Sequence, residues 1–166
     1  MTYNWIEEPY SPQSRYDDMS NVEPEFWKKK KLEDMTKQEW ELLCDGCGKC
    51  CLNKVQIRKE IKFTNTVCRF LDCQTCLCKI YQHRFEKVPD CRDIDIAAIR
   101  EQPRWLPITC AYWRLDNGLD LPEWHPLLTG QAESVHKAQM SLRNRNVISE
   151  SEVLDYEDYL IDWKDI

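Results

Sequence analysis

The chain lacks the features that mark membrane-spanning and secreted proteins. Its sequence has no run of about 18 apolar residues, the length that a membrane-spanning helix requires. The first residues, Met1 to Pro9, contain no basic segment followed by an apolar one, so we expect no secretory signal. We therefore expect no membrane partner and place the protein in the reducing cytoplasm, where thiols persist and disulfides do not.

The common motifs of hydrolases and nucleotide-binding enzymes are also absent. The sequence has no G-x-S-x-G, no H-E-x-x-H, no Walker-type loop and no G-x-G-x-x-G. Its formal net charge is −6, whereas binding to nucleic acid requires a basic face. We interpret the one basic run, Lys28 to Lys31, as a solvated helix face. We predict no nucleic-acid partner, and the sequence leaves open whether the protein is an enzyme.

Cysteine is what the sequence has in excess. All ten cysteines fall between Cys44 and Cys110, and both flanks contain none. In a reducing compartment, this concentration points to metal binding rather than to a disulfide framework or to free thiols. The length of 166 residues suits one domain. We predict an irregular N-terminal arm over residues 1–21 and a single cysteine-cluster domain over residues 22–166, with its metal core at residues 44–110.

The densest part of this region places four thiols in eight residues, Cys44-Asp-Gly-Cys47-Gly-Lys-Cys50-Cys51. A C-x2-C turn sets two sulfurs about one metal ion's width apart. Here two such turns overlap at Cys47. Three thiols at this spacing also match the first three ligands of bacterial ferredoxin-type clusters, whose fourth cysteine comes from elsewhere in the chain. The spacing indicates a metal site and slightly favours an iron–sulfur cluster over zinc.

The adjacent pair Cys50 and Cys51 adds a geometric constraint. In an extended backbone, neighbouring side chains point in opposite directions, so we expect these two sulfurs to serve different metal positions. Cys76 and Cys78 have the same-side spacing of a strand, which would let them share a site. Among the histidines, His83 is the best candidate ligand because it lies inside the cysteine region, although a lone histidine is more often a hydrogen-bonding residue.

The rest of the sequence predicts a small, mainly α fold, α+β at most, with a short β element beside an irregular, metal-stabilised cysteine core. Helices are expected at Pro24 to Met35, after a capping box at Thr36 to Glu39, at Ile80 to Lys87, around Ile96 to Arg100 with Asp93 or Asp95 as its cap, from Pro107 to Asn117, and after a second capping box at Ser149 to Glu152. Two short strands are expected between Val55 and Thr64, where β-branched and aromatic residues recur.

The cysteine run resembles the signature of the bacterial CxxCxxCC family of zinc- or iron-chelating proteins. The chain is most similar to the YcgN-like branch of that family, over roughly residues 24–156. The segments that carry this resemblance include Phe26-Trp27, Phe63-Thr64-Asn65, Pro89-Asp90-Cys91, Trp105-Leu106-Pro107 and Trp124-His125-Pro126-Leu127-Leu128-Thr129-Gly130.

The resemblance implies that nine of the ten cysteines chelate metal. They are Cys44, Cys47, Cys50, Cys51, Cys68, Cys76, Cys78, Cys91 and Cys110. Cys73 lies outside the family pattern and is left out. We expect an iron–sulfur cluster or zinc at one or two sites, with a redox, sensing or cofactor-assisted role and an unidentified protein partner. The alternatives are a structural zinc module for protein interaction and an iron or zinc carrier.

Overall fold

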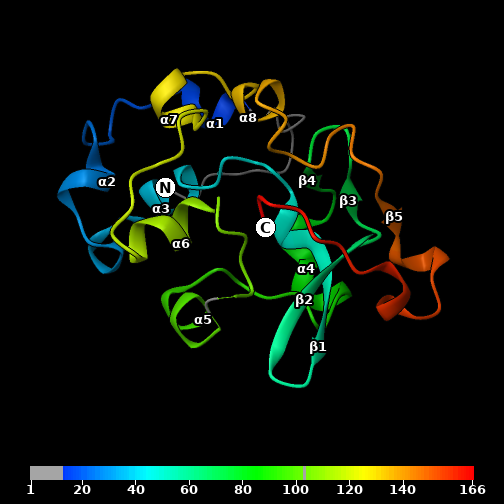
Figure 1. The fold of residues 1–166 in the computed structure, drawn as a ribbon. Helices are drawn as coiled ribbons and strands as arrows, with labels where there is room; N and C mark the ends of the chain where they lie inside the picture. Colours follow the sequence, from blue (N-terminus) through cyan, green and yellow to red (C-terminus); the bar gives the residue numbers. More distant parts are fainter. Residues whose placement is uncertain (1–12, 103) are drawn as a thin grey trace.

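The computed structural model describes residues 13–102 and 104–166 as an α+β fold of short helices and small sheets (Figure 1). The helices are α1 Ser14–Asp17, α2 Phe26–Lys29, α3 Lys37–Leu42, α4 Arg84–Lys87, α5 Ile96–Glu101, α6 Ala111–Asp116, α7 Pro126–Thr129 and α8 Ser134–Lys137. The strands are β1 Leu52–Ile57, β2 Glu60–Val67, β3 Leu71–Asp72, β4 Leu77–Cys78 and β5 Ile148–Ser149. Most of the N-terminal arm expected over residues 1–21 lies outside the described residues.

The expectation of a mainly α fold is wrong. Among the described residues, the longest helices, α3, α5 and α6, have six residues each, whereas β2 alone has eight. The helix expected from Pro24 to Met35 is divided into α2 and a separate 3-10 turn, Leu32–Asp34. Helices this short are not stable in isolation. They depend on tertiary packing, which a helical spacing of apolar residues does not describe.

Two of the predicted local capping signals are confirmed. The Thr36 hydroxyl accepts a hydrogen bond from the Glu39 amide, and the Glu39 carboxylate accepts one from the Thr36 amide, so α3 begins with a complete capping box. The Asp95 side chain accepts from the amide of Ala98 and begins α5. Such caps satisfy amides that have no partner within the helix, and they act over three residues. They are therefore predictable from sequence.

The main sheet has the order β1-β2-β5. Strands β1 and β2 form an antiparallel hairpin, which confirms the two strands expected after the cysteine run and extends both of them. Strand β5 adds to β2 in parallel, through Thr66 opposite Ile148 and Val67 opposite Ser149. A second, two-stranded sheet pairs β3 with β4 and holds Leu71 opposite Cys78.

The expectation of an acidic final helix is wrong. Ser149 caps only a 3-10 turn, Glu150–Glu152, and a second 3-10 turn follows at Tyr156–Tyr159. The chain then runs beside β2, where the amide of Ile161 donates to the carbonyl of Phe63 at 3.0 Å. Contact with the sheet overrides the helical spacing of apolar residues in this segment. Figure 1 shows the C-terminal residues, in red, reaching the middle of the molecule.

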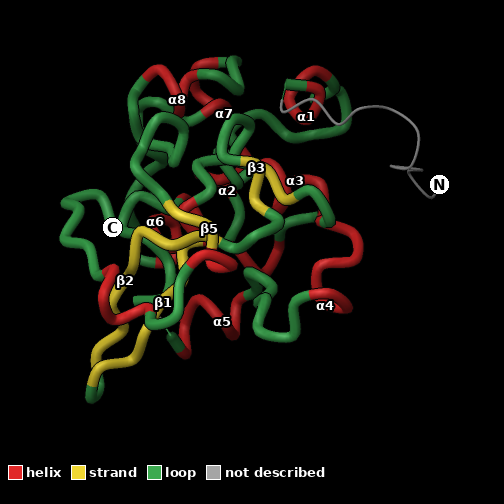
Figure 2. The backbone as a smooth tube through the Cα atoms, turned by 90° about the vertical axis from the view of Figure 1, so that its right-hand side faces the viewer, coloured by secondary structure: helices red, strands yellow, loops and turns green. Residues whose placement is uncertain are grey.

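Two apolar clusters form the interior. The helical cluster contains Val22, Phe26, Trp27, Leu32, Leu42, Leu43, Ile99, Leu106, Ala111, Tyr112 and Leu121. The sheet cluster contains Leu52, Phe63, Val67, Leu71, Cys76 and Leu142. Among the described residues, no group of side chains is placed to hold a metal ion, so the expectation of a core stabilised by metal is also corrected. Figure 2 shows the helices and the sheet from a second direction. None of the described helices has the length and apolar character needed to cross a bilayer.

Candidate functional site

The first cysteine run is a loop between α3 and β1, and its shape is set by two glycines. Gly46 and Gly48 have φ values of +76° and +78°, a left-handed conformation that glycine adopts without steric cost. Between them, the amide of Cys47 donates to the Asp45 carboxylate at 3.0 Å. A Cβ at Gly48 would lie 3.1 Å from the Cβ of Cys76, so this glycine also permits a close approach of two chain segments.

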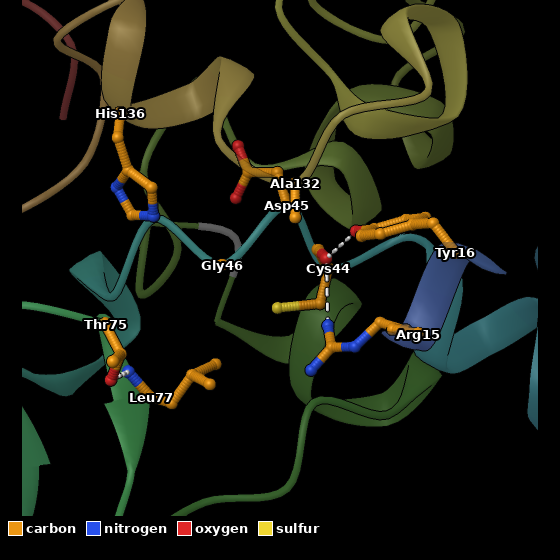
Figure 3. Close-up of a pocket in the computed structure, with 9 residues that line it drawn as sticks. All are labelled: Arg15, Tyr16, Cys44, Asp45, Gly46, Thr75, Leu77, Ala132 and His136. Atoms are coloured by element: carbon orange, nitrogen blue, oxygen red, sulfur yellow. Dashed lines mark hydrogen bonds between the residues drawn. The ribbon is translucent and has the colours of Figure 1, made fainter. Parts of the chain in front are cut away.

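Helix α1 fixes the start of this loop. Arg15 Nη1 and the Tyr16 hydroxyl both donate to the carbonyl of Cys44, at 3.0 and 2.8 Å (Figure 3). Cys44, Asp45 and His136 line a small pocket there. The centre of a water molecule can occupy about 10 Å³ of it, so the pocket has room for one water. The side chains of the pocket are drawn in Figure 3. No sequence pattern indicated that α1 holds the cysteine loop.

Four cysteines form what we call the inner thiol group: Cys44, Cys47, Cys50 and Cys110. Burial raises the pKa of the Cys44 thiol, and the charge of Cys50 raises it further. Burial likewise raises the pKa of Cys110, with added contributions from Asp45 and Cys44. Three members, Cys44, Cys50 and Cys110, pack against the helical cluster. Helix α6, which begins directly after Cys110, therefore brings this cysteine from a distant part of the sequence to the cysteine run.

Three further cysteines form the outer thiol group: Cys68, Cys78 and Cys91. The pKa of Cys68 is raised by burial, and the charges of Cys78 and Cys91 add to that effect. The pKa of Cys91 is also raised by burial, while Arg84 opposes the rise and the charges of Cys78 and Cys50 add to it. Cys50 and Cys91 are thus the members through which the two groups act on each other.

Cys50 and Cys51 do not lie in an extended backbone. They end the 3-10 turn Lys49–Cys51, so their side chains are not forced to opposite sides. A hydrogen bond with Cys51, together with burial, raises the pKa of Cys50 well above its ordinary value. The sulfurs therefore lie together, although Cys50 packs against the helical cluster and Cys51 against the sheet cluster. Whether they serve different metal positions stays a prediction.

Cys76 and Cys78 have different neighbours. Cys76 adopts a left-handed backbone, with φ of +58°, and precedes β4, so the strand spacing that would align it with Cys78 does not apply. Burial raises the pKa of Cys76, and hydrogen bonds from Arg143, Leu142 and Ser141 oppose the rise. Cys76 therefore belongs to the sheet cluster. Cys73, the cysteine outside the family pattern, packs against the same cluster.

The thiols are gathered but do not form a ready-made metal site. Within residues 13–102 and 104–166, no three side chains of His, Cys, Asp or Glu are placed to hold a metal ion. All ten cysteines are free thiols. The donors suit zinc or iron, because thiolate is the preferred soft ligand of both zinc and iron–sulfur sites. The donor chemistry is therefore that of a zinc or iron site, and metal binding by these cysteines stays a prediction.

The histidines are hydrogen-bonding residues in this structure. The ring of the fully buried His125 accepts from the amide of Leu127 at 3.1 Å and meets the carbonyl of Leu43 at 3.0 Å, so both nitrogens are occupied. His136 contacts the hydroxyl of Ser141 at 2.7 Å. His83 is exposed and lies 3.6 Å from the Glu86 carboxylate. The preference for His83 as a ligand gains no support from this geometry.

Two lysines bring positive charge to the cysteine loop. Lys49 is fully buried, and its ammonium group lies 2.5 Å from the Asp165 carboxylate. The ammonium group of Lys54 donates to the carbonyls of Cys50 and Leu52, at 2.9 and 2.7 Å. Burial lowers the pKa of Lys54 to about 8, against the charges of the neighbouring thiols. Asp165 lies 116 residues from Lys49, so sequence spacing offered no signal for this pair.

The chain has close relatives in several bacteria. A UPF0260 protein of Granulibacter bethesdensis is 50% identical over 140 residues, which cover 83% of each chain. One of Rhizorhabdus wittichii is 52% identical over 139 residues, which cover 82% of this chain and 94% of the relative. One of Shewanella denitrificans is 48% identical over 145 residues, covering 85% and 98%. No family model matches the chain, and no solved structure matches it.

Proposed function

We propose that this chain, which belongs to the UPF0260 family, is a cysteine-cluster metalloprotein that holds zinc or iron through thiolates of the inner thiol group. The observation that carries the proposal is the position of Cys110. It lies within electrostatic reach of Cys44, at the start of the C-x2-C-x2-C run. Three thiols at that spacing with a fourth from a distant segment is the ligand arrangement of a bacterial ferredoxin-type cluster. It also suffices for a closed, four-thiolate zinc site.

The surroundings of the inner thiol group support a charged metal–thiolate centre. Four thiolates on one divalent ion leave a net charge of about −2. The ammonium group of Lys54, which donates to the Cys50 carbonyl at 2.9 Å, lies where it offsets part of that charge. Without metal, the raised pKa of Cys47 and Cys50 keeps both as neutral thiols. Metal binding must then displace their protons.

The role of the centre follows from which metal it holds. An iron–sulfur cluster supplies one-electron redox chemistry or senses oxidants, and this role is favoured by the triple cysteine spacing. Three of the inner thiols, those of Cys44, Cys50 and Cys110, are partly buried against the helical cluster, which limits contact of a cluster with solvent. The resemblance of the cysteine run to the zinc- or iron-chelating CxxCxxCC family, and to its YcgN-like branch, supports metal chelation and leaves the activity open. The reducing cytoplasm, where ten free thiols persist, is part of the proposal.

The test is purification without oxygen, followed by metal and sulfide analysis and an absorption spectrum. An iron–sulfur cluster predicts iron and acid-labile sulfide together with visible absorption that bleaches on reduction. Zinc predicts a colourless protein with one or more ions for each chain. Protein that retains neither metal, and that takes up neither on reconstitution with intact thiols, would refute the proposal. The Cys73→Ser variant is the matched control, because Cys73 belongs to neither thiol group.

A further inference from the structure

We propose that a polar groove between β2, the segment that joins α8 to β5, and the C-terminal segment binds a small organic oxyanion, either a phosphate ester or a carboxylate. Arg143, Arg145 and Asn144 are the main donors to this ligand. The inference does not depend on the cysteines, since none of them is among the described residues that line the groove. It adds a site for a dissolved ligand to the proposed metal centre.

The groove has the size of a ligand site. Its water-accessible volume is about 590 Å³, within the range of about 300–1,000 Å³ that is usual for small-molecule sites. The lining comes from Asn65 of β2, from α8 and the segment that follows it, and from Ile161 and Trp163 near the C-terminus (Figure 1). Parts of the chain that are distant in sequence therefore form it together, and it can hold a molecule larger than an inorganic ion.

The groove has an excess of positive charge. Among the described residues that line it, Arg143 and Arg145 carry a charge, and none has a carboxylate. Arg145 binds the Asp165 carboxylate at 2.6 Å, but Lys49 binds the same carboxylate at 2.5 Å. Two cations thus share one negative charge, and because Lys49 has no exposed surface, the excess charge reaches solution through Arg145. A groove lined by charges of one sign attracts counter-ions.

Arg143 has a partner that a ligand can replace. Its guanidinium group donates two hydrogen bonds to the Glu133 carboxylate, at 2.6 and 3.2 Å, and a third to the carbonyl of Gln74. The side chain of Glu133 is 51% exposed, and ion pairs at the surface contribute little net stability. Because a guanidinium group binds carboxylate and phosphate in the same paired geometry, an incoming oxyanion can take the place of Glu133.

Further donors of the lining have no partner in the described part of the chain. The amide side chains of Gln139, Asn144 and Asn146 are exposed and form no hydrogen bond there, and neither does the indole N–H of Trp163. Gln139 and Asn144 have positive φ, +60° and +65°, a costly conformation for residues other than glycine that recurs at binding sites. Arg145 lies 4.6 Å from the centroid of the Trp163 ring, which fixes its place. Such a set of N–H donors suits a ligand with several acceptor oxygens.

Isothermal titration calorimetry of the reduced, full-length chain tests the inference. Three probes are titrated in Tris buffer, which contains no competing oxyanion: inorganic phosphate, glycerol 3-phosphate and succinate. We expect at least one of the two organic probes to bind at one site for each chain, with a Kd below about 1 mM and more tightly than inorganic phosphate. The preference between glycerol 3-phosphate and succinate then identifies the ligand as a phosphate ester or a carboxylate.

Variants with opposite expected effects make the test specific to the groove. Arg143→Gln should weaken binding of the preferred probe about tenfold, the loss expected for one charge-assisted contact. Glu133→Gln should tighten binding, because it removes the charge that competes for Arg143. Asn144→Gly should weaken binding, since it tolerates the positive φ but lacks the amide. Arg69→Gln is the matched control and should bind as wild type does, because Arg69 also pairs with a glutamate, Glu150 at 3.0 Å, but does not line the groove.

Several results would overturn the inference. They are the absence of binding for both organic probes, binding of inorganic phosphate alone, and equal affinities of wild type and Arg143→Gln. An equal loss in Arg69→Gln and Arg143→Gln would do the same, because it would show a general effect of surface charge. Circular dichroism checks that each variant is folded. If Arg143→Gln does not fold, Glu133→Gln and Asn144→Gly decide the outcome, and unchanged affinity in both would refute the site.

Discussion

The ammonium group of Lys49 lies 2.5 Å from the carboxylate of Asp165, although 116 residues separate the two in the chain. Lys49 has no exposed surface, and it also donates to the Thr109 hydroxyl at 3.2 Å. Arg145 binds the same carboxylate at 2.6 Å. The pair therefore ties three segments together: the cysteine run, the segment that ends in Cys110, and the C-terminus. Because Lys49 lies within the cysteine run, the pair ties that run to the C-terminal segment.

Replacing Asp165 with Asn should lower the free energy of unfolding by about 3 kcal/mol. Removing one partner of a buried ion pair leaves the other charge buried without compensation, which costs about 3–5 kcal/mol, and the partial exposure of Asp165 favours the lower value. Urea unfolding of the metal-free, reduced protein measures the change. Asp162→Asn, at an exposed position three residues earlier, is the control and should change the stability by less than about 0.5 kcal/mol. Equal effects of the two substitutions would contradict the role of the pair.

The same pair predicts a pH dependence. Burial raises the pKa of Asp165, but hydrogen bonds from Arg145 and Lys49 outweigh it, so the pKa lies below its ordinary value. A carboxyl group with a lowered pKa in the folded state stabilises that state above its unfolded pKa of about 3.9. The stabilisation is lost as the pH falls through the folded pKa. The stability difference between wild type and Asp165→Asn should therefore be constant near neutral pH and shrink below about pH 4. A difference that grows on acidification would contradict this account.

The two glycines of the cysteine loop should respond differently to alanine. Both have positive φ, so each substitution carries a backbone cost of about 1–2 kcal/mol. Gly48→Ala also places a Cβ 3.1 Å from the Cβ of Cys76, whereas Gly46→Ala meets nothing within 4 Å. Gly48→Ala should therefore be the more destabilising of the two in urea unfolding. If the two variants unfold alike, the close approach of the loop to Cys76 is not needed for stability.

His125 should matter for stability and not for metal content. Its ring satisfies the amide of Leu127 and the carbonyl of Leu43, and an unsatisfied buried polar group costs about 1–3 kcal/mol. His125→Ala should lower the unfolding free energy by at least that amount, and His136→Ala, at a less buried position, should cost less. Metal content for each folded chain should stay at the wild-type value in both variants. A selective loss of metal in His125→Ala would identify it as a ligand.

Signals that act over a few residues were predictable from sequence. The Thr36 capping box, the cap at Asp93 or Asp95 and the two strands β1 and β2 each depend on neighbouring residues. All three are confirmed, with Asp95 as the cap. The final helix was wrong because its apolar residues, such as Trp163, pack against the sheet cluster in an extended segment. The spacing of those residues fits a helix, but pairing with β2 fixes the chain in another conformation.

The sequence indicated which residue type forms the candidate site, but it did not indicate which cysteines the fold brings together. The spacing of Cys44, Cys47 and Cys50 defined a group that the fold keeps together. The addition of Cys110 depends on where α6 packs, which no local pattern specifies. The strand spacing of Cys76 and Cys78 failed because Cys76 takes a left-handed conformation in a turn.

The measurement that tests the central claim most directly is native mass spectrometry of the full chain purified without oxygen. We predict a mass above that of the metal-free chain by bound zinc, or by iron with sulfide, in wild type and in Cys73→Ser. The part of this excess that belongs to the inner thiol group should be absent in Cys47→Ser and in Cys110→Ser. Wild-type protein that has the metal-free mass with all ten thiols reduced, and that gains none on reconstitution, would contradict the account.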